Sequence, residues 1–320
     1  MRSLITGVGG FAGQHLAARL LTDSAAQVFG VARTAVHWHD PDLGQNRGLE
    51  LVQADLLSAE EARRAVKLAR PDHVYLLAAQ SSPPEAFVDP LKTITNNVAC
   101  VVNVLEALRD LTADARVLVV SSAAVYGSSP AGGESIGESA PMAPDNPYAV
   151  SKAVQDMLGY QYYASYGLQV IRVRPFNHIG PGQDERFAAA GFAKQITEAE
   201  AGRRDRVIDA GNLSAERDFT DVRDMVRAYQ LALVRCEAGK TYNLASGRAR
   251  SVQSLLDGLA ARSSVPITVR FDPTRARPVD APILVGDASL FRERSNWVPE
   301  IPFEQTLQDI LDDWRRRVGA

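Results

Sequence analysis

Tyr148 and Lys152, spaced as Tyr-x-x-x-Lys, are the residues of this sequence whose types and spacing most clearly indicate chemistry. On a helix, residues four apart lie on one face, so the phenol and the ammonium would be neighbours. A tyrosine pKa of about 10 makes a poor base, but a nearby ammonium and an oxidised nicotinamide both favour the phenolate. Ser122 adds a hydroxyl that could hold the same substrate oxygen. Together these side chains predict hydride transfer at a carbinol or ketone.

Alone, this spacing is weak evidence, because Tyr148 could be a packed aromatic and Lys152 a solvated lysine. A glycine-rich stretch near the N-terminus strengthens the prediction. Gly7, Gly10 and Gly13 follow the strand-like run Leu4–Thr6 and open a stretch of helical spacing over Phe11–Leu21. Glycine permits a tight turn and lets backbone N–H groups at a helix N-terminus approach a pyrophosphate. We therefore expect a dinucleotide site here, with Phe11 and Ala12 among its contacts.

The end of the second predicted strand, Val28–Val31, bears on the choice of cofactor. A carboxylate at this place would bind the ribose 2′-hydroxyl of NAD. The sequence has Arg33 instead, and a planar guanidinium can pair with a 2′-phosphate. NADP(H) is therefore favoured, with NAD(H) or a merely solvated arginine as the alternatives. Further expected cofactor contacts are Asp55 and Leu56 beside the adenine, Ala78, Ala79 and Gln80 beside the pyrophosphate, and Leu77 and Asn97.

Apolar runs that alternate with helical spacing predict a doubly wound, parallel α/β sheet of the Rossmann type. The runs Leu51–Ala54, Val74–Leu77, Val117–Val120, Val170–Val173 and Tyr242–Leu244 suit strands, and Glu60–Leu68 and Asn97–Leu108 suit crossover helices. Further helices are expected over Tyr148–Tyr166, Phe192–Ala201 and Phe303–Val318. We expect a dinucleotide-binding domain over residues 1–176, with segments near 218–250 returning to it. A smaller substrate-binding lobe would comprise residues 177–217 and 251–320.

Composition and charge argue against several classes of protein. A net charge of −3 and a pI near 6.0 disfavour a binder of nucleic acid or of anionic membranes. No apolar window approaches the roughly 20 residues of a membrane span, and no signal-peptide core precedes the first strand. Cys100 and Cys236 lie far apart, which predicts a reducing cytoplasm and no metal site. His178 is expected to pack or hydrogen-bond rather than to catalyse.

The combined motifs resemble those of the extended short-chain dehydrogenase/reductase family, in its nucleotide-sugar branch. Beyond the glycine loop, the resemblance rests on Ser121–Gly127, Asn146–Lys152, Arg174–Gln183, Arg217–Asp224 and Arg277–Asp280. It covers essentially the whole chain and is greatest to the GDP-mannose dehydratase and GDP-4-keto-6-deoxy-D-mannose reductase group. The resemblance implies that Ser122, Tyr148 and Lys152 form the catalytic triad.

The resemblance also implies a substrate. Its leading implication is NAD(P)H-dependent reduction of the 4-keto group of a nucleotide-linked 6-deoxyhexose, GDP-4-keto-6-deoxy-D-mannose to GDP-D-rhamnose. Substrate contacts would come from Asn177 and Ser122 on the sugar, from Lys194, Arg217 and Arg277 on the diphosphate or nucleotide, and from Asp280. Each cation taken singly would more often be a solvated surface charge. A homodimer through the helices over Asn97–Leu108 and Tyr148–Tyr166 is a further implication.

Ala124 bears on which reaction follows. The 4,6-dehydratases that this sequence resembles carry a glutamate at the corresponding position, and an alanine cannot exchange a proton. Dehydration is therefore disfavoured. The stretch Ser121–Gly127 also resembles that of UDP-sugar 4-epimerases, so a 4-epimerase with tightly held NAD is the alternative. A nucleotide-sensing protein without catalysis is a third, which the intact triad disfavours.

Overall fold

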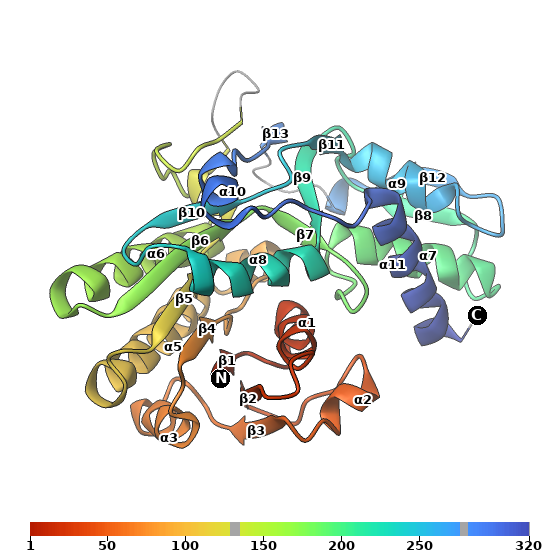
Figure 1. Ribbon diagram of the computed structural model, residues 1–320. Helices are drawn as coiled ribbons and strands as arrows, with labels where there is room; N and C mark the ends of the chain where they lie inside the picture. Colours follow the sequence, from red (N-terminus) through yellow and green to blue (C-terminus); the bar gives the residue numbers. More distant parts are fainter. Residues whose placement is uncertain (129–134, 276–280, 320) are drawn as a thin grey trace.

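The computed structural model describes residues 1–128, 135–275 and 281–319, and a seven-stranded parallel sheet forms its centre (Figure 1). The strand order is β10-β6-β5-β4-β1-β2-β3. This order confirms the predicted doubly wound sheet, and the expected strands all lie in it, within two residues of their predicted bounds. The strands are β1 (Arg2–Thr6), β2 (Gln27–Ala32), β3 (Leu49–Gln53), β4 (His73–Leu76), β5 (Arg116–Val120), β6 (Gln169–Pro175) and β10 (Thr241–Leu244).

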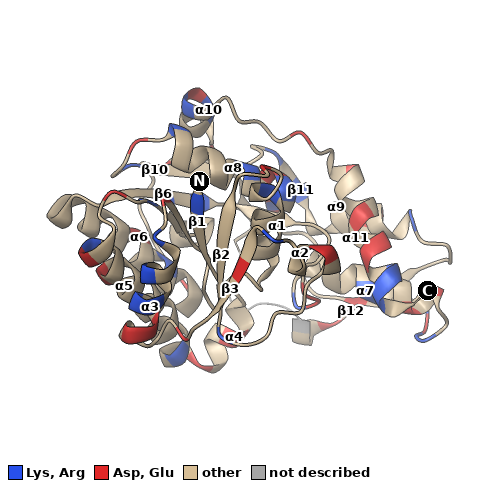
Figure 2. Cartoon of the chain, turned by 60° about the horizontal axis from the view of Figure 1, so that its bottom comes forward, with Lys and Arg blue, Asp and Glu red and all other residues tan. Residues whose placement is uncertain are grey.

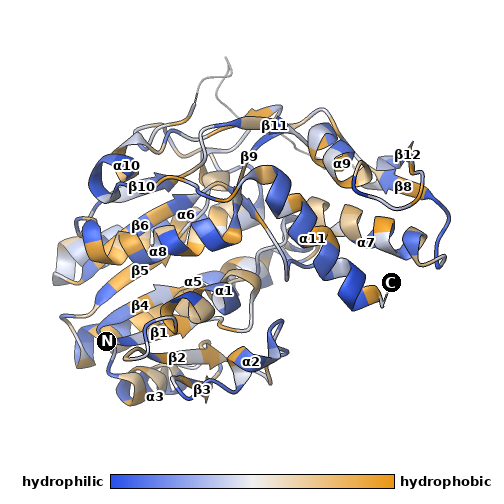
Figure 3. Ribbon diagram, turned by 45° about the vertical axis from the view of Figure 1, so that its right-hand side comes forward, coloured by the Kyte–Doolittle hydropathy of each residue, from blue (hydrophilic) through white to orange (hydrophobic). Residues whose placement is uncertain are grey.

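Helices cover both faces of this sheet. On one face lie α1 (Phe11–Leu20) and α8 (Val222–Arg235), and on the other lie α3 (Ala59–Ala69), α5 (Pro90–Leu111) and α6 (Pro147–Tyr166) (Figure 1). Neighbouring strand residues point to opposite faces, so Ile5 joins the core under α1 and α8 while Leu4 joins the other. This explains why the inner strands β1, β4 and β5 carry apolar runs, which Figure 3 shows as hydrophobic colour, whereas the edge strand β3 is mostly exposed.

Local signals set where the helices near the site begin. Asn146 caps α6 by accepting a hydrogen bond from Ala149 N at 2.9 Å, and Pro147 follows in the first turn. Asp89 caps α5 in the same way through Lys92 N at 3.0 Å, so this helix begins before the predicted Asn97. The helices α3 and α11 (Phe303–Val318) carry acidic residues in the first turn and basic ones in the last, which complements the helix dipole (Figure 2).

The second part of the chain builds smaller sheets around a separate hydrophobic core. Strands β7 (Asn177–Ile179), β11 (Ala249–Ser251) and β13 (Ile283–Leu284) pair with β9 (Glu216–Asp221), and β8 (Val207–Ala210) pairs with β12 (Thr268–Phe271). Helices α7 (Ala188–Glu200), α9 (Val252–Ala260) and α11 enclose that core. The remaining elements are α2 (Pro41–Gly44), α4 (Pro83–Val88), η1 (Ala123–Tyr126), η2 (Pro273–Arg275) and α10 (Ser289–Ser295).

The two-part division of the chain stays a prediction. One element departs from it, because α10 falls within the range 251–320 yet packs against α8 and β10 beside the central sheet. Its Phe291 belongs to the core under α1 and α8, where its ring lies 5.7 Å from that of Trp297. Among the described residues, no helix is long and apolar enough to cross a membrane.

A buried polar network joins α6 to the strands beside it. Asp156, on α6, accepts hydrogen bonds from Arg172 Nη1 and Arg174 Nε, both at 2.8 Å. Arg174 Nη1 donates to the Tyr126 hydroxyl at 2.9 Å, and that hydroxyl donates to Asn243 Oδ1 at 2.7 Å. The network thereby fixes η1, and with it the segment that follows β5, against α6, β6 and β10.

Asp156→Ala tests this network, because the substitution leaves two guanidinium groups partly or fully buried without their carboxylate. The Asp156 side chain is 0% exposed, so we expect a loss of about 3–5 kcal/mol in the free energy of unfolding, measured by urea titration. Asp110→Ala is the matched control, since that carboxylate also pairs with two arginines but is 41% exposed. Its expected loss is much smaller, because solvent screens these exposed pairs. Equal losses for the two variants would contradict the structural role of Asp156.

Candidate active site

The glycine loop joins the end of β1 to the start of α1. Gly7 has a φ of 70°, and a Cβ on it would lie 2.9 Å from Ala78 Cα. A Cβ on Gly13 would lie 2.4 Å from the carbonyl oxygen of Gly7. Side chains at these two positions would therefore collide with backbone. Gly10 is the N-cap residue of α1 and offers no side chain to cap it, which leaves first-turn N–H groups available to an anion.

The segment after β4 is fastened beside this loop. Thr6 Oγ1 accepts hydrogen bonds from Leu77 N at 3.0 Å and Ala78 N at 3.1 Å. Gln80 N donates to Asn97 Oδ1 at 2.7 Å, and Asn97 Nδ2 donates to Gln80 O at 3.0 Å. The expected contacts Leu77, Ala78, Ala79 and Gln80 thus follow β4 next to the glycine loop. The Asn97 side chain itself bridges this segment to α6, and its predicted contact with the cofactor stays a prediction.

Arg33 lies exposed beyond the end of β2, where its charge and that of Asp55 both act on Cys100 of α5. Burial, with a smaller contribution from Asp55 and against the opposing effect of Arg33, raises the pKa of Cys100 to about 11. The ends of β2 and β3 and the flank of α5 therefore converge. Asn103 of α5 also contacts this region, since its Nδ2 donates to the carbonyl oxygen of Leu56 at 2.9 Å.

The segment that follows Arg33 contains His37 and His39. Residues of α1 and α11 that no sequence motif indicated bind it from two sides. Gln14 Nε2 donates to Gly9 O and to His37 O, both at 3.1 Å, and His39 N donates to Gln14 Oε1 at 2.7 Å. From the opposite side, Asp313 of α11 lies 3.2 Å from His39 Nε2. These contacts join the glycine loop, the segment after Arg33 and the C-terminal helix α11.

Ser122, Tyr148 and Lys152 come together at the carboxyl end of β5, next to β4 and β1 in the sheet. Ser122 begins η1, where its hydroxyl accepts a hydrogen bond from Ala124 N at 3.1 Å. Burial raises the pKa of Tyr148 above its usual value, and a hydrogen bond between Ser122 and the phenol acts in the opposite direction. At neutral pH the phenol is therefore protonated, which suits a proton donor.

Lys152 is buried against neutral acceptors. Its Nζ donates to Val120 O at 2.8 Å and to Gln155 Oε1 at 2.9 Å. Burial lowers the pKa of Lys152 to about 7. Gln155 was missed in the sequence, although its position three residues after Lys152 on a helix is a signal that could have found it.

Comparison with known proteins bears on the family. The family model described as GDP-mannose 4,6 dehydratase matches residues 4–310. The chain belongs to this family. It is 34% identical over 317 residues to GDP-6-deoxy-D-mannose reductase of Pseudomonas aeruginosa, a match that covers 99% of this chain and 98% of that protein. The resemblance to the nucleotide-sugar branch of the extended short-chain dehydrogenases/reductases is thereby confirmed.

Two solved structures have the same fold over nearly their whole length. RMD from Pseudomonas aeruginosa complexed with NADPH has a TM-score of 0.86 and 32% identity, covering 99% of this chain and 100% of that one. UDP-glucose 4-epimerase of Thermus thermophilus in complex with NAD has a TM-score of 0.84 and 28% identity, covering 98% of this chain and 99% of that one. Members of this fold thus bind NADPH in one case and NAD in the other.

The substrate contacts that the family resemblance implied are dispersed over the second part of the chain. Asn177 is exposed at the start of β7. Lys194 of α7 pairs with Glu185 and Glu198, and its hydrogen bond to Glu185 raises its pKa. Arg217 of β9 is buried and donates to Ala281 O and Glu216 O, both at 2.7 Å. Arg277 and Asp280 lie outside the described residues. Substrate binding by all five therefore stays a prediction.

His178 packs, as its sequence context predicted. Its ring stacks on Phe11 with centroids 5.9 Å apart, and its Nδ1 lies 3.3 Å from Phe176 O. Burial lowers the pKa of His178, which keeps the ring neutral at pH 7. Within the ranges that the structure describes, no group of three or more His, Cys, Asp or Glu side chains could hold a metal ion.

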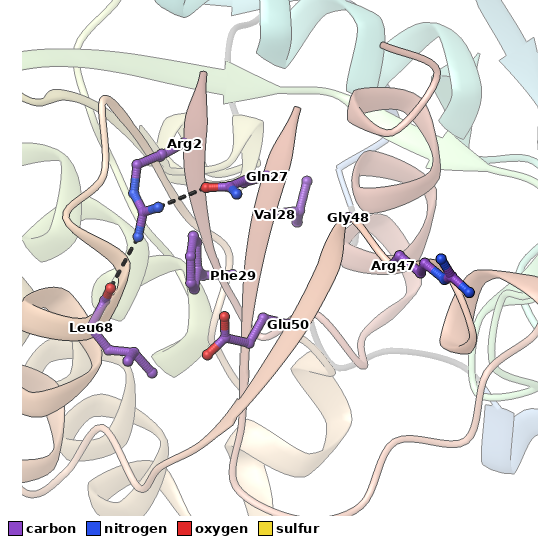
Figure 4. Close-up of a pocket in the computed structure, with 8 residues that line it drawn as sticks. All are labelled: Arg2, Gln27, Val28, Phe29, Arg47, Gly48, Glu50 and Leu68. Carbon is purple, nitrogen blue, oxygen red and sulfur yellow. Dashed lines mark hydrogen bonds between the residues drawn. The ribbon is translucent and has the colours of Figure 1, made fainter. Parts of the chain in front are cut away.

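A surface pocket at the opposite edge of the sheet is not part of this site. It is lined by residues at the amino ends of β1 to β3 and beside them: Arg2, Gln27, Val28, Phe29, Arg47, Gly48, Glu50 and Leu68 (Figure 4). Arg2 donates to Gln27 Oε1 at 2.7 Å and to Leu68 O at 3.1 Å, and it lies 4.6 Å above the Phe29 ring. Its guanidinium is therefore engaged in holding the sheet edge together. In doubly wound sheets, ligands bind at the carboxyl ends of the strands, where the triad lies.

Proposed function

We propose that this protein reduces the 4-keto group of a nucleotide-linked 6-deoxyhexose with NADPH. The substrate would be GDP-4-keto-6-deoxy-D-mannose and the product GDP-D-rhamnose. The observation that carries the proposal is that Tyr148 bonds to Ser122 while Lys152, one turn later on α6, bonds to Val120 O at the end of β5, at the same carboxyl edge of the sheet from which the glycine loop leaves β1. The 34% identity to GDP-6-deoxy-D-mannose reductase and the NADPH complex of a 32% identical neighbour support the choice of substrate and cofactor.

Each member of the triad has a task that its surroundings suit. Bound NADPH would supply the hydride that C4 receives. As the C4 carbonyl oxygen gains negative charge, Tyr148 donates its proton to it, and Ser122 holds that oxygen by a hydrogen bond. The ammonium of Lys152 stabilises the phenolate that remains, since a nearby positive charge favours the ionised form. One hydride and one proton add to the carbonyl, which yields the alcohol.

A 4-epimerase is the second candidate, because the 28% identical UDP-glucose 4-epimerase shares the fold over 98% of this chain. Ala124 supports neither candidate over the other, but it weighs against dehydration. Its side chain carries no acid, and its backbone N–H binds Ser122.

Assays on purified protein distinguish the two candidates. A reductase oxidises NADPH only when a 4-keto sugar nucleotide is supplied, whereas an epimerase retains NAD through purification and interconverts sugars without net cofactor consumption. We would supply GDP-, UDP-, dTDP- and CDP-linked 4-keto-6-deoxy sugars and follow absorbance at the NADPH band. Bound NAD with no NADPH oxidation on any substrate would overturn the reductase proposal.

The two free cysteines bear on localisation. Cys236 is buried and Cys100 is half-buried, and neither forms a disulfide in the described parts of the chain. Reduced cysteines are typical of the cytoplasm, which supports a cytoplasmic location for the protein.

Tyr148→Phe tests the proposed proton donor. The substitution removes only the hydroxyl, so we expect kcat to fall by about 10²- to 10⁴-fold while the Kd for NADPH, measured by fluorescence titration, is unchanged. Tyr160→Phe is the matched control, since it makes the same change on the exposed side of the same helix. Near-normal turnover of Tyr148→Phe would exclude the proposed mechanism.

Arg33→Ala tests cofactor choice. No hydrogen bond or ion pair within the described residues engages the Arg33 guanidinium, which leaves it available to a 2′-phosphate. A charge-assisted contact at an exposed place contributes about 1 kcal/mol, so the KM for NADPH should rise about fivefold while that for NADH stays the same. Arg47→Ala, another exposed arginine near the N-terminus, should change neither. Equal losses for the two cofactors would remove Arg33 as the group that recognises the phosphate.

We infer further that two copies of the chain associate through α5 and α6. These helices pack on each other and leave apolar side chains uncovered, among them Leu91 at 76%, Met157 at 55% and Tyr160 at 52% exposure. Such side chains on neighbouring helices are suited to a partner surface. A second copy is the partner that the family resemblance implies.

Met157→Arg should therefore abolish the dimer, because a charge at the interface would have to be desolvated. Light scattering after gel filtration should show the mass fall to that of one chain, 34.7 kDa. Val234→Arg makes the same change at an equally exposed residue of α8 and should leave the dimer intact. A wild-type protein that is already monomeric would disprove the inference.

A further inference from the structure

Gln155 lies one helical turn after Lys152 and connects it to the neighbouring helix. Its Oε1 accepts a hydrogen bond from Lys152 Nζ at 2.9 Å, and its Nε2 donates to the carbonyl oxygen of Asn97 on α5 at 2.6 Å. Gln155 is only 1% exposed, so water does not compete for these bonds. Both ends of one side-chain amide are thus engaged between the proposed catalytic lysine and α5.

We propose that Gln155 is a positioning residue for Lys152, which ties the ammonium to α5 and leaves one of its N–H groups for the cofactor and Tyr148. An ammonium has three N–H donors. Val120 O and Gln155 Oε1 take two of them at 2.8 and 2.9 Å. This inference rests on the proposed function, because it assumes that Lys152 acts on Tyr148.

The amide of Gln155 is neutral, and its neutrality preserves the charge of Lys152. A carboxylate at the same place would form an ion pair with Lys152 and neutralise the charge that is meant to act on Tyr148. An apolar side chain would leave an N–H of a buried ammonium without an acceptor, which is costly. An amide accepts the hydrogen bond without cancelling the charge. Burial alone lowers the pKa of Lys152, to about 7, so no charged neighbour sets that value.

The elements packed against α6 are consistent with this. Several charged and titratable groups on these elements are engaged with partners of their own. Asp156, one turn beyond Lys152, is bound by Arg172 and Arg174. Further groups of this kind are Tyr126 on η1, bound to Arg174; Glu106 on α5, bound to Tyr162; and Glu85 on α4, bound to Gln80 and Arg186. Tyr229 on α8 is buried, which raises its pKa, and Tyr148 adds to this rise.

A pair of substitutions at Gln155 separates positioning from simple packing. Gln155→Glu places a carboxylate on the ammonium and should raise the pKa of Lys152, whereas Gln155→Met removes an acceptor of the charged form and should lower it. We expect about a tenfold change in the acid dissociation constant in each direction, a shift of about one pH unit. A role in packing alone would not move the pKa in opposite directions.

The pKa can be measured directly, because the chain has only five lysines, Lys67, Lys92, Lys152, Lys194 and Lys240. We would label lysine with ¹³C at Cε, assign the Lys152 signal by its loss in Lys152→Arg, and titrate it by NMR in the wild type and both variants. Gln253→Met is the matched control, since among the described residues the Gln253 side chain bonds to Asp257 of the same helix, α9, and to no other. It should leave the Lys152 midpoint unchanged.

The second measurement is the pH dependence of kcat/KM for the NADPH-dependent reaction. Above the pKa of Lys152 the ammonium is lost, so the upper pH limit of activity should rise in Gln155→Glu and fall in Gln155→Met. A Lys152 midpoint that stays fixed, or that moves the same way in both variants, overturns the proposal. A midpoint that moves while the pH limit does not overturns it too.

Failure of this inference is distinguishable from failure of the proposed function. If no 4-keto sugar nucleotide is reduced, the proposed function fails, and the NMR titration still decides whether Gln155 governs Lys152. If Gln155→Met does not fold, Gln155→Glu alone decides: a raised midpoint supports the proposal, and an unchanged or lowered one overturns it.

Discussion

The constraint on which the candidate site depends is the burial of one ammonium group. Lys152 is 4% exposed, and its two hydrogen-bond acceptors, a backbone carbonyl and the amide of Gln155, are both neutral. A charge placed in this way has lost water and gained no counter-ion, so its charged form is costly. The cost appears as a pKa lowered to about 7. In the proposed reaction this unneutralised charge is what makes the phenol of Tyr148 able to give up its proton.

A buried charge of this kind needs rigid surroundings, and the polar network around α6 provides them. Ser151 Oγ donates to Tyr148 O at 2.7 Å and accepts from Asn97 Nδ2 at 2.9 Å, which joins the first turn of α6 to α5. On the other side, Asp156 and Arg174 fasten α6 to β6 and to Tyr126 of η1. Ser122 begins η1, so the same bonds that stabilise the fold also fix the distance between the serine and the phenol.

Much of this could be predicted from the sequence, because the strands and motifs are local patterns. Most of the seven strands contain short apolar runs, and Gly7, Tyr148 and Lys152 lie in motifs whose spacing is itself the signal. Gln14 carries no such signal, and for Gln155 the spacing indicates only its bond to Lys152, three residues before it on the same helix. The bonds of Gln155 to Asn97 and of Gln14 to His39 span 58 and 25 residues, so only the folded chain brings them together. Sequence likewise does not reveal that Lys194 pairs with Glu185, which precedes α7, although the spacing of Lys194 and Glu198 on the helix does indicate their pair.

The position of Arg33 bears on the choice between reduction and epimerisation. A reductase must release its oxidised cofactor after each turnover, whereas an epimerase returns the hydride to the same molecule and gains by never releasing it. Arg33 is exposed, so its attraction for a 2′-phosphate is screened by salt and modest in strength. A contact of this kind discriminates between two cofactors without holding either permanently. The same physical argument that makes Arg33 a weak anchor therefore favours an enzyme that exchanges its cofactor, as the proposed reductase does.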